Sequence, residues 1–449
     1  MTIHVGSAAS LYRMQEHPGL WPHRGHVAAV GIGHAPTMRR WDERTETSVG
    51  AWSIRAIRAA IEDAGVDPAE VDGLALCEDT SHGSPWPVGQ PPPEGFATMY
   101  TASADPLDGL ARLSAEWLLK NMPELVNIKY VVVAPICMSA VLTAAIQAVG
   151  DGLTNVCVAV KGWHNFAGRY AHGGANAQDT VAGPAKWLNA VAGPPIYRTA
   201  VQFQRYLHKY GKSHDMMAPF VVNSRANGLL FPEGYWAQHR PEPITVEGYL
   251  DSRMIAEPAN LLDNDLPIHT AGAYVVTTAE RAKDLRQRPA YVLGHAGVGV
   301  ADNGSWGPMR SNGAVESLED VEEWSAATGR RVYESAGITA RDVTFENMYD
   351  GFSLFHVFHI EGLGFAGIKQ GEALDLFQTD ISIYGPNPVS PSGGNIGGGR
   401  ARFWNHTDTI QQIQGRAGAR SITAPIVTGV SGGWQAWQCN AIVWSPTPG

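Results

Sequence analysis

The chain contains 449 residues, of which 44% are hydrophobic and 17% charged, a composition typical of a globular protein with a large core. A formal net charge of -10 argues against a protein that binds nucleic acid through its phosphates. Residues 1–25 contain no apolar run of signal-peptide length, and no later run approaches a membrane span. We therefore expect a cytoplasmic protein without membrane contact. The few cysteines are widely spaced, so neither a zinc site nor a disulfide framework is expected.

The first half of the chain alternates predicted strands and helices. Short apolar runs predict strands, whereas amphipathic or alanine-rich stretches predict helices. In chain order these are strand 26–33, helix 45–64, strand 71–78, helix 107–120, strand 128–134, helix 139–150 and strand 155–161. Residues 81–98 are rich in proline and glycine and predict a surface loop. This alternation predicts a largely parallel sheet covered on both faces.

A long excursion, residues 163–266, separates the two halves and contains the predicted helices 195–210 and 245–254. Excursions of this size are usually functional, so we expect a cap over a site or a partner surface. The predicted elements after it are strand 271–278, strand 290–294, helix 316–335, strand 343–348, helix 354–363, a glycine-rich loop, helix 401–415 and strands 424–430 and 438–444. We predict an N-terminal extension, 1–25, and two similar halves, 26–280 and 281–449.

The turn Tyr349-Asp350-Gly351-Phe352 lies between the predicted strand 343–348 and helix 354–363. The carboxyl end of a strand is a common place for catalytic groups in α/β proteins. Tyr349 can donate a proton to an oxygen that gains negative charge, and Asp350 can orient the tyrosine or accept a proton. The structural alternative is that Tyr349 ends the strand while Asp350 caps the following helix. We predict an active site at this turn.

An ordered set of short motifs resembles the thiolase superfamily. The motifs are Asp67-Pro-Ala-Glu-Val-Asp-Gly73, Cys137-Met-Ser-Ala140, Asp251-Ser-Arg-Met-Ile-Ala-Glu-Pro258, Ala271-Gly-Ala273, Tyr349-Asp-Gly-Phe352, Asn387-Pro-Val-Ser-Pro-Ser-Gly-Gly-Asn395 and Gly432-Gly433. The resemblance extends from about Val27 to Trp444 and is to the lipid-transfer-protein, or SCP-x, thiolase-like branch, which includes steroid side-chain-cleaving aldolases. It implies an α/β thiolase-like fold, with two duplicated β-α-β-α-β halves in a layered α/β/α/β/α arrangement.

The resemblance also places the catalytic positions of a thiolase on this chain. The nucleophilic cysteine of a C-x-S-G turn corresponds to Cys137, with alanine in place of the glycine. A thiolate at a helix N-terminus has a lowered pKa and can accept an acyl group, but a small residue buried beneath the helix is the equal alternative. The asparagine turn of thiolases corresponds to the turn at Tyr349, the histidine of the G-H-P motif to Arg400, and the second cysteine to Val430.

These replacements favour retro-aldol cleavage over thiolysis. Thiolysis needs proton transfer where this chain has Arg400 and Val430, which do not exchange protons readily at neutral pH. Retro-aldol cleavage needs a base for a β-hydroxyl and donors for a thioester enolate, but no covalent intermediate. Tyr349 with Asp350 can supply the acid or base. The predicted oxyanion and substrate contacts are Arg400 and the backbone around Gly393, Gly394, Gly432 and Gly433.

The resemblance implies an acyl-CoA carbon–carbon lyase that cleaves a β-hydroxyacyl-CoA, with a steroid side chain as one candidate, to a ketone or aldehyde and a shorter acyl-CoA. Two alternatives stay open: a thiolase or acyltransferase that uses Cys137, and a non-catalytic scaffold for a partner enzyme. The CoA thioester is the expected substrate, and no bound cofactor is expected. A homodimer is also implied, with segments 128–134 and 139–150 suited to its interface. The second implied partner is a DUF35-type protein with an OB fold and a zinc ribbon.

Other polar residues have structural interpretations. Tyr249 and Tyr291 are options for a second catalytic tyrosine, but structural roles are the better interpretation for both. His356 and His359 lie three residues apart without a third ligand at matching spacing, so we interpret them as packed helix histidines. No arginine is selected by its spacing as a contact for CoA.

Overall fold

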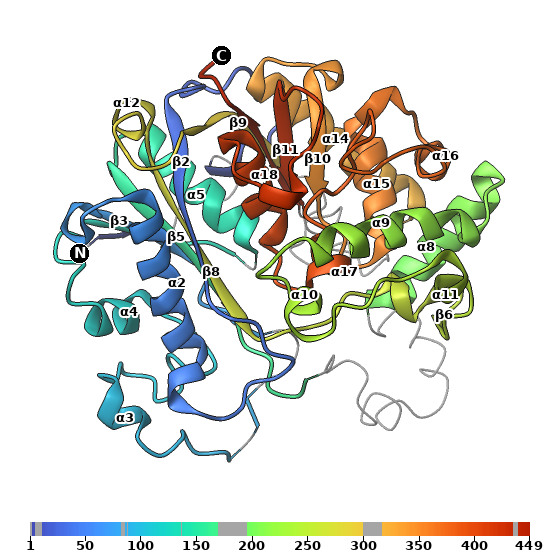
Figure 1. The fold of residues 1–449 in the computed structure, drawn as a ribbon. Coiled ribbons are helices and arrows are strands. Elements are labelled where there is room, and N and C mark those ends of the chain that lie inside the picture. The colour runs from blue at the N-terminus through green and yellow to red at the C-terminus, as the bar shows by residue number, and fades with distance from the viewer. Residues whose placement is uncertain are drawn as a thin grey trace.

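The chain folds into five layers, in the order helix, sheet, helix, sheet, helix (Figure 1). The computed structural model describes residues 2–4, 11–81, 86–87, 89–135, 137–168, 195–299, 317–433 and 439–449. The strands are β1 (Thr2–His4), β2 (Val27–His34), β3 (Gly73–Leu76), β4 (Tyr130–Val133), β5 (Val156–Trp163), β6 (Met254–Ala256), β7 (Ala259–Asn260), β8 (Thr270–Thr278), β9 (Ala290–Val298), β10 (Val343–Met348), β11 (Thr428–Gly432) and β12 (Cys439–Ser445). The helices are α2 (Val49–Ala64), α3 (Phe96–Met99), α4 (Ala115–Asn121), α5 (Met138–Gly150), α8 (Pro195–Tyr210), α9 (Ala218–Leu229), α10 (Tyr235–His239), α11 (Val246–Leu250), α12 (Ala279–Ala282), α14 (Leu318–Ala336), α15 (Ser353–Leu363), α16 (Ala373–Leu376), α17 (Gly394–Gly398) and α18 (Trp404–Gln414).

The order of the strands shows that the two halves repeat one topology. From its outer edge inward, the first half runs β1-β4-β3-β5-β8-β2, with β1, β4, β3 and β5 parallel and the last two pairings antiparallel. The second half runs β10-β11-β12-β9, again with a parallel pair followed by two antiparallel pairings. A parallel bridge between Glu346 and Val389 lies beside β10, where the first half has β4. The predicted duplication is confirmed, although the second half has a single bridge at the position where the first half has strand β4.

The two halves join where β2 pairs with β9, at Ala28 with Tyr291 and Ala29 with Ala290. This junction merges the strands into one mixed sheet. The prediction of a largely parallel sheet is therefore wrong. Helix–strand alternation predicts parallel neighbours only where a helix crosses over between them, and β8 and β12 enter the sheet without such a crossover.

Three groups of helices separate and cover the two halves of the sheet. Helix α2 packs on the outer face of the first half, where a Cβ on Gly31 or Gly33 would overlap its backbone. Helices α5 and α18 form the central layer between the two inner faces. Helices α14 and α15 cover the outer face of the second half. The layered arrangement predicted for the fold is thus confirmed.

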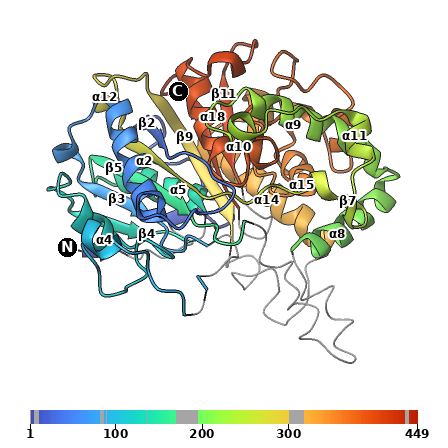
Figure 2. The same cartoon turned by 60° about the horizontal axis from the view of Figure 1, so that its bottom comes forward.

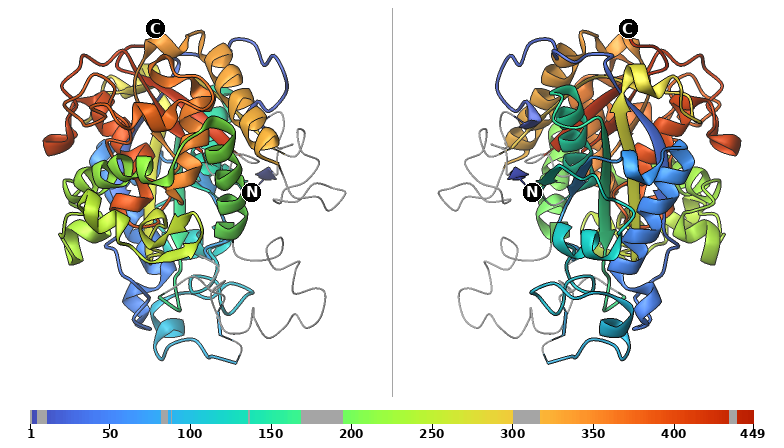
Figure 3. Two further views of the ribbon diagram at one scale, coloured as in Figure 1. Left: turned by 90° about the vertical axis from the view of Figure 1, so that its right-hand side faces the viewer. Right: turned by 90° about the vertical axis from the view of Figure 1, so that its left-hand side faces the viewer.

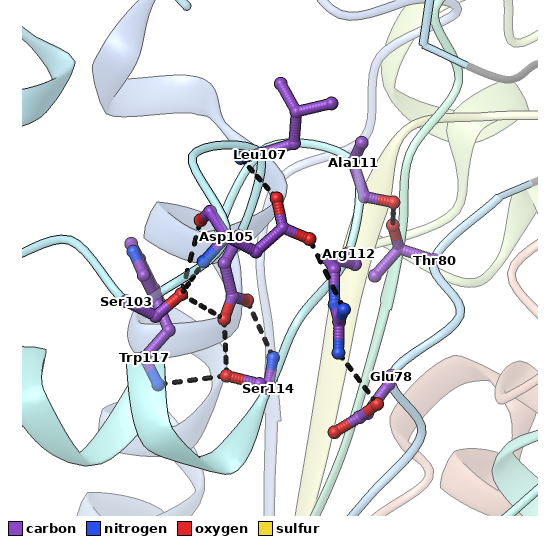
Figure 4. Close-up of polar contacts among 10 residues, drawn as sticks. Glu78, Thr80, Ser103, Asp105, Leu107, Ala111, Arg112, Ser114 and Trp117 are labelled. Carbon is purple, nitrogen blue, oxygen red and sulfur yellow. Dashed lines mark hydrogen bonds and ion pairs between the residues drawn. The ribbon is translucent and has the colours of Figure 1, made fainter.

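The first part of the predicted helix 107–120 is instead a loop held by polar contacts, and α4 begins only after Ser114 (Figure 4). Asp108 Oδ1 accepts the Ser114 N–H at 2.8 Å. Arg112 links this loop to the end of β3, since its guanidinium lies 3.3 Å from Asp105 Oδ2 and 2.9 Å from Glu78 Oε2. Aspartate side chains that bind nearby N–H groups compete with the helix, which is why the helix prediction is wrong here.

The excursion packs on the second half of the chain, although it follows the strands of the first. Figure 1 shows α9 beside α15 and α17, and Figure 2 shows α8 beside α14 and α15. Contacts join α9 to α17, and α8 to α14 and α15. The buried side chains of Phe203, Tyr206 and Phe220 belong to the same hydrophobic cluster as α14 and α15. The excursion therefore helps to build the layer that covers the second half.

The predicted dimer face needs correction at one of its two segments. Helix α5 is buried inside its own chain, with Val141, Leu142 and Ile146 fully covered, so the prediction that segment 139–150 faces a partner is wrong. Its apolar character comes from being covered on both sides, as expected for a central layer. Strand β1, beside the label N in Figure 3, pairs with β4 from Thr2 with Tyr130 onward, so β1 and not β4 forms this edge of the sheet. The dimer itself stays a prediction.

Candidate active site

The predicted turn at residues 349–352 joins β10 to α15, beside α17 and α18 in Figure 1. The Tyr349 side chain is only 5% exposed, and its ring stacks on Phe355 with 6.2 Å between the ring centroids. A Cβ on Gly351 would overlap the Tyr349 hydroxyl, so only glycine at 351 permits this fold-back of the tyrosine. Burial raises the pKa of Tyr349, which keeps it a neutral phenol at physiological pH.

Asp350 points its carboxylate at the start of α17. Its Oδ1 accepts the backbone N–H of Asn395 at 2.7 Å and the side-chain amide of the same residue at 3.0 Å. Its Oδ2 accepts the N–H of Ile396 at 3.1 Å. Burial raises the pKa of Asp350, while these N–H donors oppose the rise. Asp350 thus caps a helix, as the structural alternative expected, but that helix is α17 and not α15.

Two buried cations lie on the indole of Trp163, at the end of β5. Lys161 Nζ is 4.0 Å and Arg402 Cζ is 4.7 Å from the ring centroid. Lys161 is fully buried and donates to the Asp79 carbonyl. The Arg402 guanidinium also lies 5.9 Å from the centroid of the Tyr349 ring. Desolvated cation–π contacts are worth about 2 kcal/mol, which offsets part of the cost of burying these charges. One of the two cations, Arg402, therefore lies beside the tyrosine.

A carboxylate that the sequence interpretation did not select completes the site. Asp265 is 4% exposed, and its Oδ2 lies 3.9 Å from Arg400 Nε. The Asp265 N–H donates to the Gly351 carbonyl at 3.2 Å, which ties this residue to the turn. Burial raises the pKa of Asp265 to about 7, although the charges of Arg400 and Arg402 lower it. Asp265 is thus able to change protonation state near neutral pH.

Cys137 lies at the N-cap of α5, where the resemblance placed it, and is 3% exposed. Burial raises the pKa of the Cys137 thiol, although the Ala140 N–H and the charges of Arg402 and Lys161 act against the rise. Cys137 thus shares its electrostatic surroundings with the tyrosine site. Its neutral thiol is the favoured form, and a neutral thiol is a poor nucleophile.

The glycines predicted as oxyanion contacts line the same region, but their N–H groups are engaged. The N–H groups of Gly393, Gly394 and Gly433 donate to acceptors of the chain at 2.8, 2.9 and 2.7 Å. Gly432 lies in β11, paired with β10 and β12. A Cβ on Gly433 would come within 3.2 Å of the Tyr349 Cβ, so this glycine allows close packing on the tyrosine. Their oxyanion role stays a prediction.

Asp263 fixes the turn from the side of the excursion. Its fully buried carboxylate lies 2.7 Å from His214 Nε2, accepts the Tyr249 hydroxyl at 2.8 Å, and accepts the Ser353 hydroxyl at the start of α15. Tyr249 is therefore held in a polar network, in keeping with its structural interpretation. Tyr291 does not share a hydrophobic cluster with Trp163. Tyr291 belongs to the cluster beneath α2, and Trp163 belongs to the cluster around α5 and α18.

The helix histidines are packed side chains. His356 Nε2 lies 3.0 Å from Glu346 Oε1, with both residues fully buried. Burial lowers the pKa of His356, but the Glu346 carboxylate, the Asp350 charge and a backbone contact with Met348 together outweigh burial and leave the pKa raised. His359 is 2% exposed and borders Gly433. Among the residues that the structure describes, no group of three or more His, Cys, Asp or Glu side chains is placed to hold a metal ion.

Sequence reasoning missed Lys161, Trp163, Asp265 and Arg402. A lysine inside an apolar strand was one available signal, because lysine is almost never fully buried without a partner. Arg402, two residues after Arg400, was a second signal. Asp265 carried no signal, since it lies in the irregular end of the excursion and only the fold brings it to the turn.

Comparison with known proteins supports the architecture. Residues 309–443 match the family described as "Thiolase C-terminal domain-like". The solved structure of the Ltp2-ChsH2(DUF35) aldolase superposes with a TM-score of 0.71 at 22% identity, over 94% of this chain and 98% of that chain. The C-terminal part of the chain therefore resembles that family. The fold of the chain is thiolase-like.

Two proteins resemble this chain in sequence over most of its length. It is 27% identical to the 17-hydroxy-3-oxo-4-pregnene-20-carboxyl-CoA lyase of Mycobacterium tuberculosis, over 90% of this chain and 97% of the lyase. It is 28% identical to the steroid side-chain-cleaving aldolase of Thermomonospora curvata, over 83% of this chain and 86% of the aldolase. Within the described ranges, no helix of the chain is both long and apolar enough to cross a membrane.

Proposed function

We propose that this chain is a carbon–carbon lyase of thiolase fold that cleaves a β-hydroxyacyl-CoA by a retro-aldol reaction. The observation that carries the proposal is the buried phenol of Tyr349 beside the guanidinium of Arg402. The Arg402 Cζ lies 5.9 Å from the centroid of the Tyr349 ring. A phenol is a proton donor, and a buried cation stabilises an enolate that forms beside it.

The thiolase groups that the reaction does not need have been replaced in this chain. The Arg400 guanidinium lies 3.9 Å from the Asp265 carboxylate, and Val430 is fully buried in β11. Neither can carry a proton between substrate and solvent. The lyase and aldolase that resemble the chain over most of its length support the same reaction class.

The substrate is an acyl-CoA in this proposal, because the M. tuberculosis relative is named for an acyl-CoA and the fold is that of thiolases. A steroid side chain is the first acyl group to test. We also propose a DUF35-type partner, supported by the solved aldolase, which contains such a protein. A homodimer and a cytoplasmic location belong to the same proposal.

An acyltransferase that uses Cys137 is the second candidate. It is favoured by the position of Cys137 at the N-cap of α5 and by the nearby positive charges of Arg402 and Lys161, which lower the thiol pKa against the effect of burial. Covalent acylation of Cys137 is the property that separates it from the lyase.

The test is turnover of a panel of β-hydroxyacyl-CoA thioesters with a DUF35-type partner present. Ketone or aldehyde release is measured for the wild type, Tyr349→Phe and Cys137→Ala, and acyl-cysteine is sought by mass spectrometry. Tyr384→Phe is the matched control, because Tyr384 is 67% exposed. The lyase predicts loss of about 100-fold or more with Tyr349→Phe only. An adduct on Cys137 whose removal stops turnover would replace the lyase with the acyltransferase.

A further inference from the structure

The retro-aldol reaction needs two proton transfers, and Tyr349 supplies only one of them. The β-hydroxyl must lose a proton before the carbon–carbon bond breaks, and the α-carbon of the leaving acyl-CoA must gain one. Burial raises the pKa of Tyr349, so at neutral pH it can donate but not accept. Another group is required as the base.

Asp350 is a poor base because its carboxylate is already used. Both of its oxygens accept N–H groups at the start of α17, at 2.7, 3.0 and 3.1 Å. A Cβ on Gly394 would overlap this carboxylate, so α17 closes tightly over it. Protonating Asp350 would replace one of these acceptor contacts with an unfavourable donor–donor contact.

Asp265 lies beside the same turn. Its N–H donates to the Gly351 carbonyl at 3.2 Å, and the preceding residue, Asn264, forms an antiparallel bridge with Phe352. The segment at Asp265 therefore runs alongside the turn that carries Tyr349. The charge of Asp265 is close enough to raise the pKa of Tyr349, and the charges of Arg400, Arg402 and Asp350 act on both residues.

We propose that Asp265, and not Asp350, is the second proton-transfer group of this site and acts as the base for the substrate β-hydroxyl. The inference rests on the proposed lyase function. Asp265 takes the hydroxyl proton, the bond between the α- and β-carbons breaks, and its electron pair passes to the α-carbon as the thioester enolate. Tyr349 then donates its proton to the α-carbon. The proton on Asp265 returns to the tyrosinate, so both groups are restored and no other reactant is consumed.

The protonation behaviour of Asp265 fits this task. Burial raises the pKa of Asp265 to about 7, so a large fraction of the carboxyl is ionised near neutral pH and can accept a proton. Arg400, with its Nε 3.9 Å from Oδ2, keeps the pKa from rising further. Activity should therefore fall as the pH drops below about 7 and Asp265 becomes protonated.

The test is the pH dependence of kcat/KM for wild type and variants with a β-hydroxyacyl-CoA and the DUF35-type partner. Asp265→Asn should reduce kcat/KM by about 100-fold or more and remove the acidic limb of the profile. Asp265→Glu should recover part of the rate. Arg400→Gln should move the acidic limb to higher pH, because a positive charge that lowers the pKa of Asp265 is lost. Asp284→Asn, at an exposed position, is the matched control and should leave the profile unchanged.

The two proposals fail in different ways. If the wild type cleaves the substrate and Asp265→Asn keeps both the wild-type rate and the acidic limb of the pH profile, this inference alone is overturned. An acidic limb that does not move in Arg400→Gln would also count against it, even if Asp265→Asn were inactive for structural reasons. Wild type that cleaves no β-hydroxyacyl-CoA at any pH would overturn the proposed lyase and this inference with it.

Discussion

The buried Asp265 carboxyl should make the chain less stable as the pH rises, and Asp265→Asn should remove this effect. Burial raises the pKa of Asp265 from 3.8 in the unfolded chain to about 7 in the folded chain. The folded state therefore binds the proton more tightly, so the group costs no stability below pH 3.8 and its cost grows until the pH passes about 7.

The size of the effect follows from the same pKa values. Each tenfold difference in proton affinity corresponds to about 1.4 kcal/mol, so the full cost above pH 7 is about 4 kcal/mol. Between pH 5 and pH 8 the cost grows by roughly 2 to 3 kcal/mol. The amide that replaces the carboxyl in Asp265→Asn carries no such cost, so the variant should gain stability over the wild type by this amount across that interval.

Urea unfolding at pH 5, 6, 7 and 8 measures the difference between the two chains. Taking the difference cancels the other titrating groups, because they are common to both. Asp284→Asn, in which an exposed carboxylate is changed, should give the same difference from wild type at every pH. A stability difference for Asp265→Asn that does not change with pH would show that this carboxyl is not buried as described, and the reasoning would fail.

Three further substitutions test the geometry of the turn. Gly351→Ala should lower the turnover of the acyl-CoA panel about 100-fold or more, because the new Cβ would overlap the Tyr349 hydroxyl. Gly248→Ala is the control and should leave turnover unchanged, because the atom nearest to its new Cβ would lie 3.4 Å away. Gly394 and Gly418 both have a positive φ, of 59° and 62°, so alanine at either position carries a strain of about 1 kcal/mol. Only in Gly394→Ala would the new Cβ overlap a buried carboxylate, so this variant should lose several kcal/mol more than Gly418→Ala in urea unfolding. Asp263→Asn should cost about 3 kcal/mol, because the Tyr249 and Ser353 hydroxyls and the His214 ring lose a buried carboxylate partner. A loss below about 1 kcal/mol in urea unfolding would show that this network does not hold the turn.

The fold was largely predictable from the sequence. The bounds of β10 and α8 agree with the predicted ranges 343–348 and 195–210, because each is a continuous apolar or amphipathic run with clear ends. The duplication followed from element order. The direction of the strands did not follow from the sequence, because it depends on which strands become neighbours, and no local sequence pattern indicates that.

The candidate site was predictable only where its residues follow one another in the chain. The turn at Tyr349 and the helix start at Cys137 are local features, and the structure places both where they were expected. The use of Asp350 by α17 depends on a contact across about 45 residues, and the approach of Asp265 to Gly351 depends on a contact across about 85. Contacts of this kind have no signature in a single sequence.

The junction between the two halves has a consequence for when the site comes into existence. Strands β2 and β9 share only the pairings at Ala28 and Ala29, so the central helices hold much of the joint. The groups around the tyrosine come from both halves and from the excursion. Contacts between such distant segments form late in folding, because long loops must close first. A substrate bound there would bridge the two halves and should make them unfold together, whereas neither half alone can contain a working site.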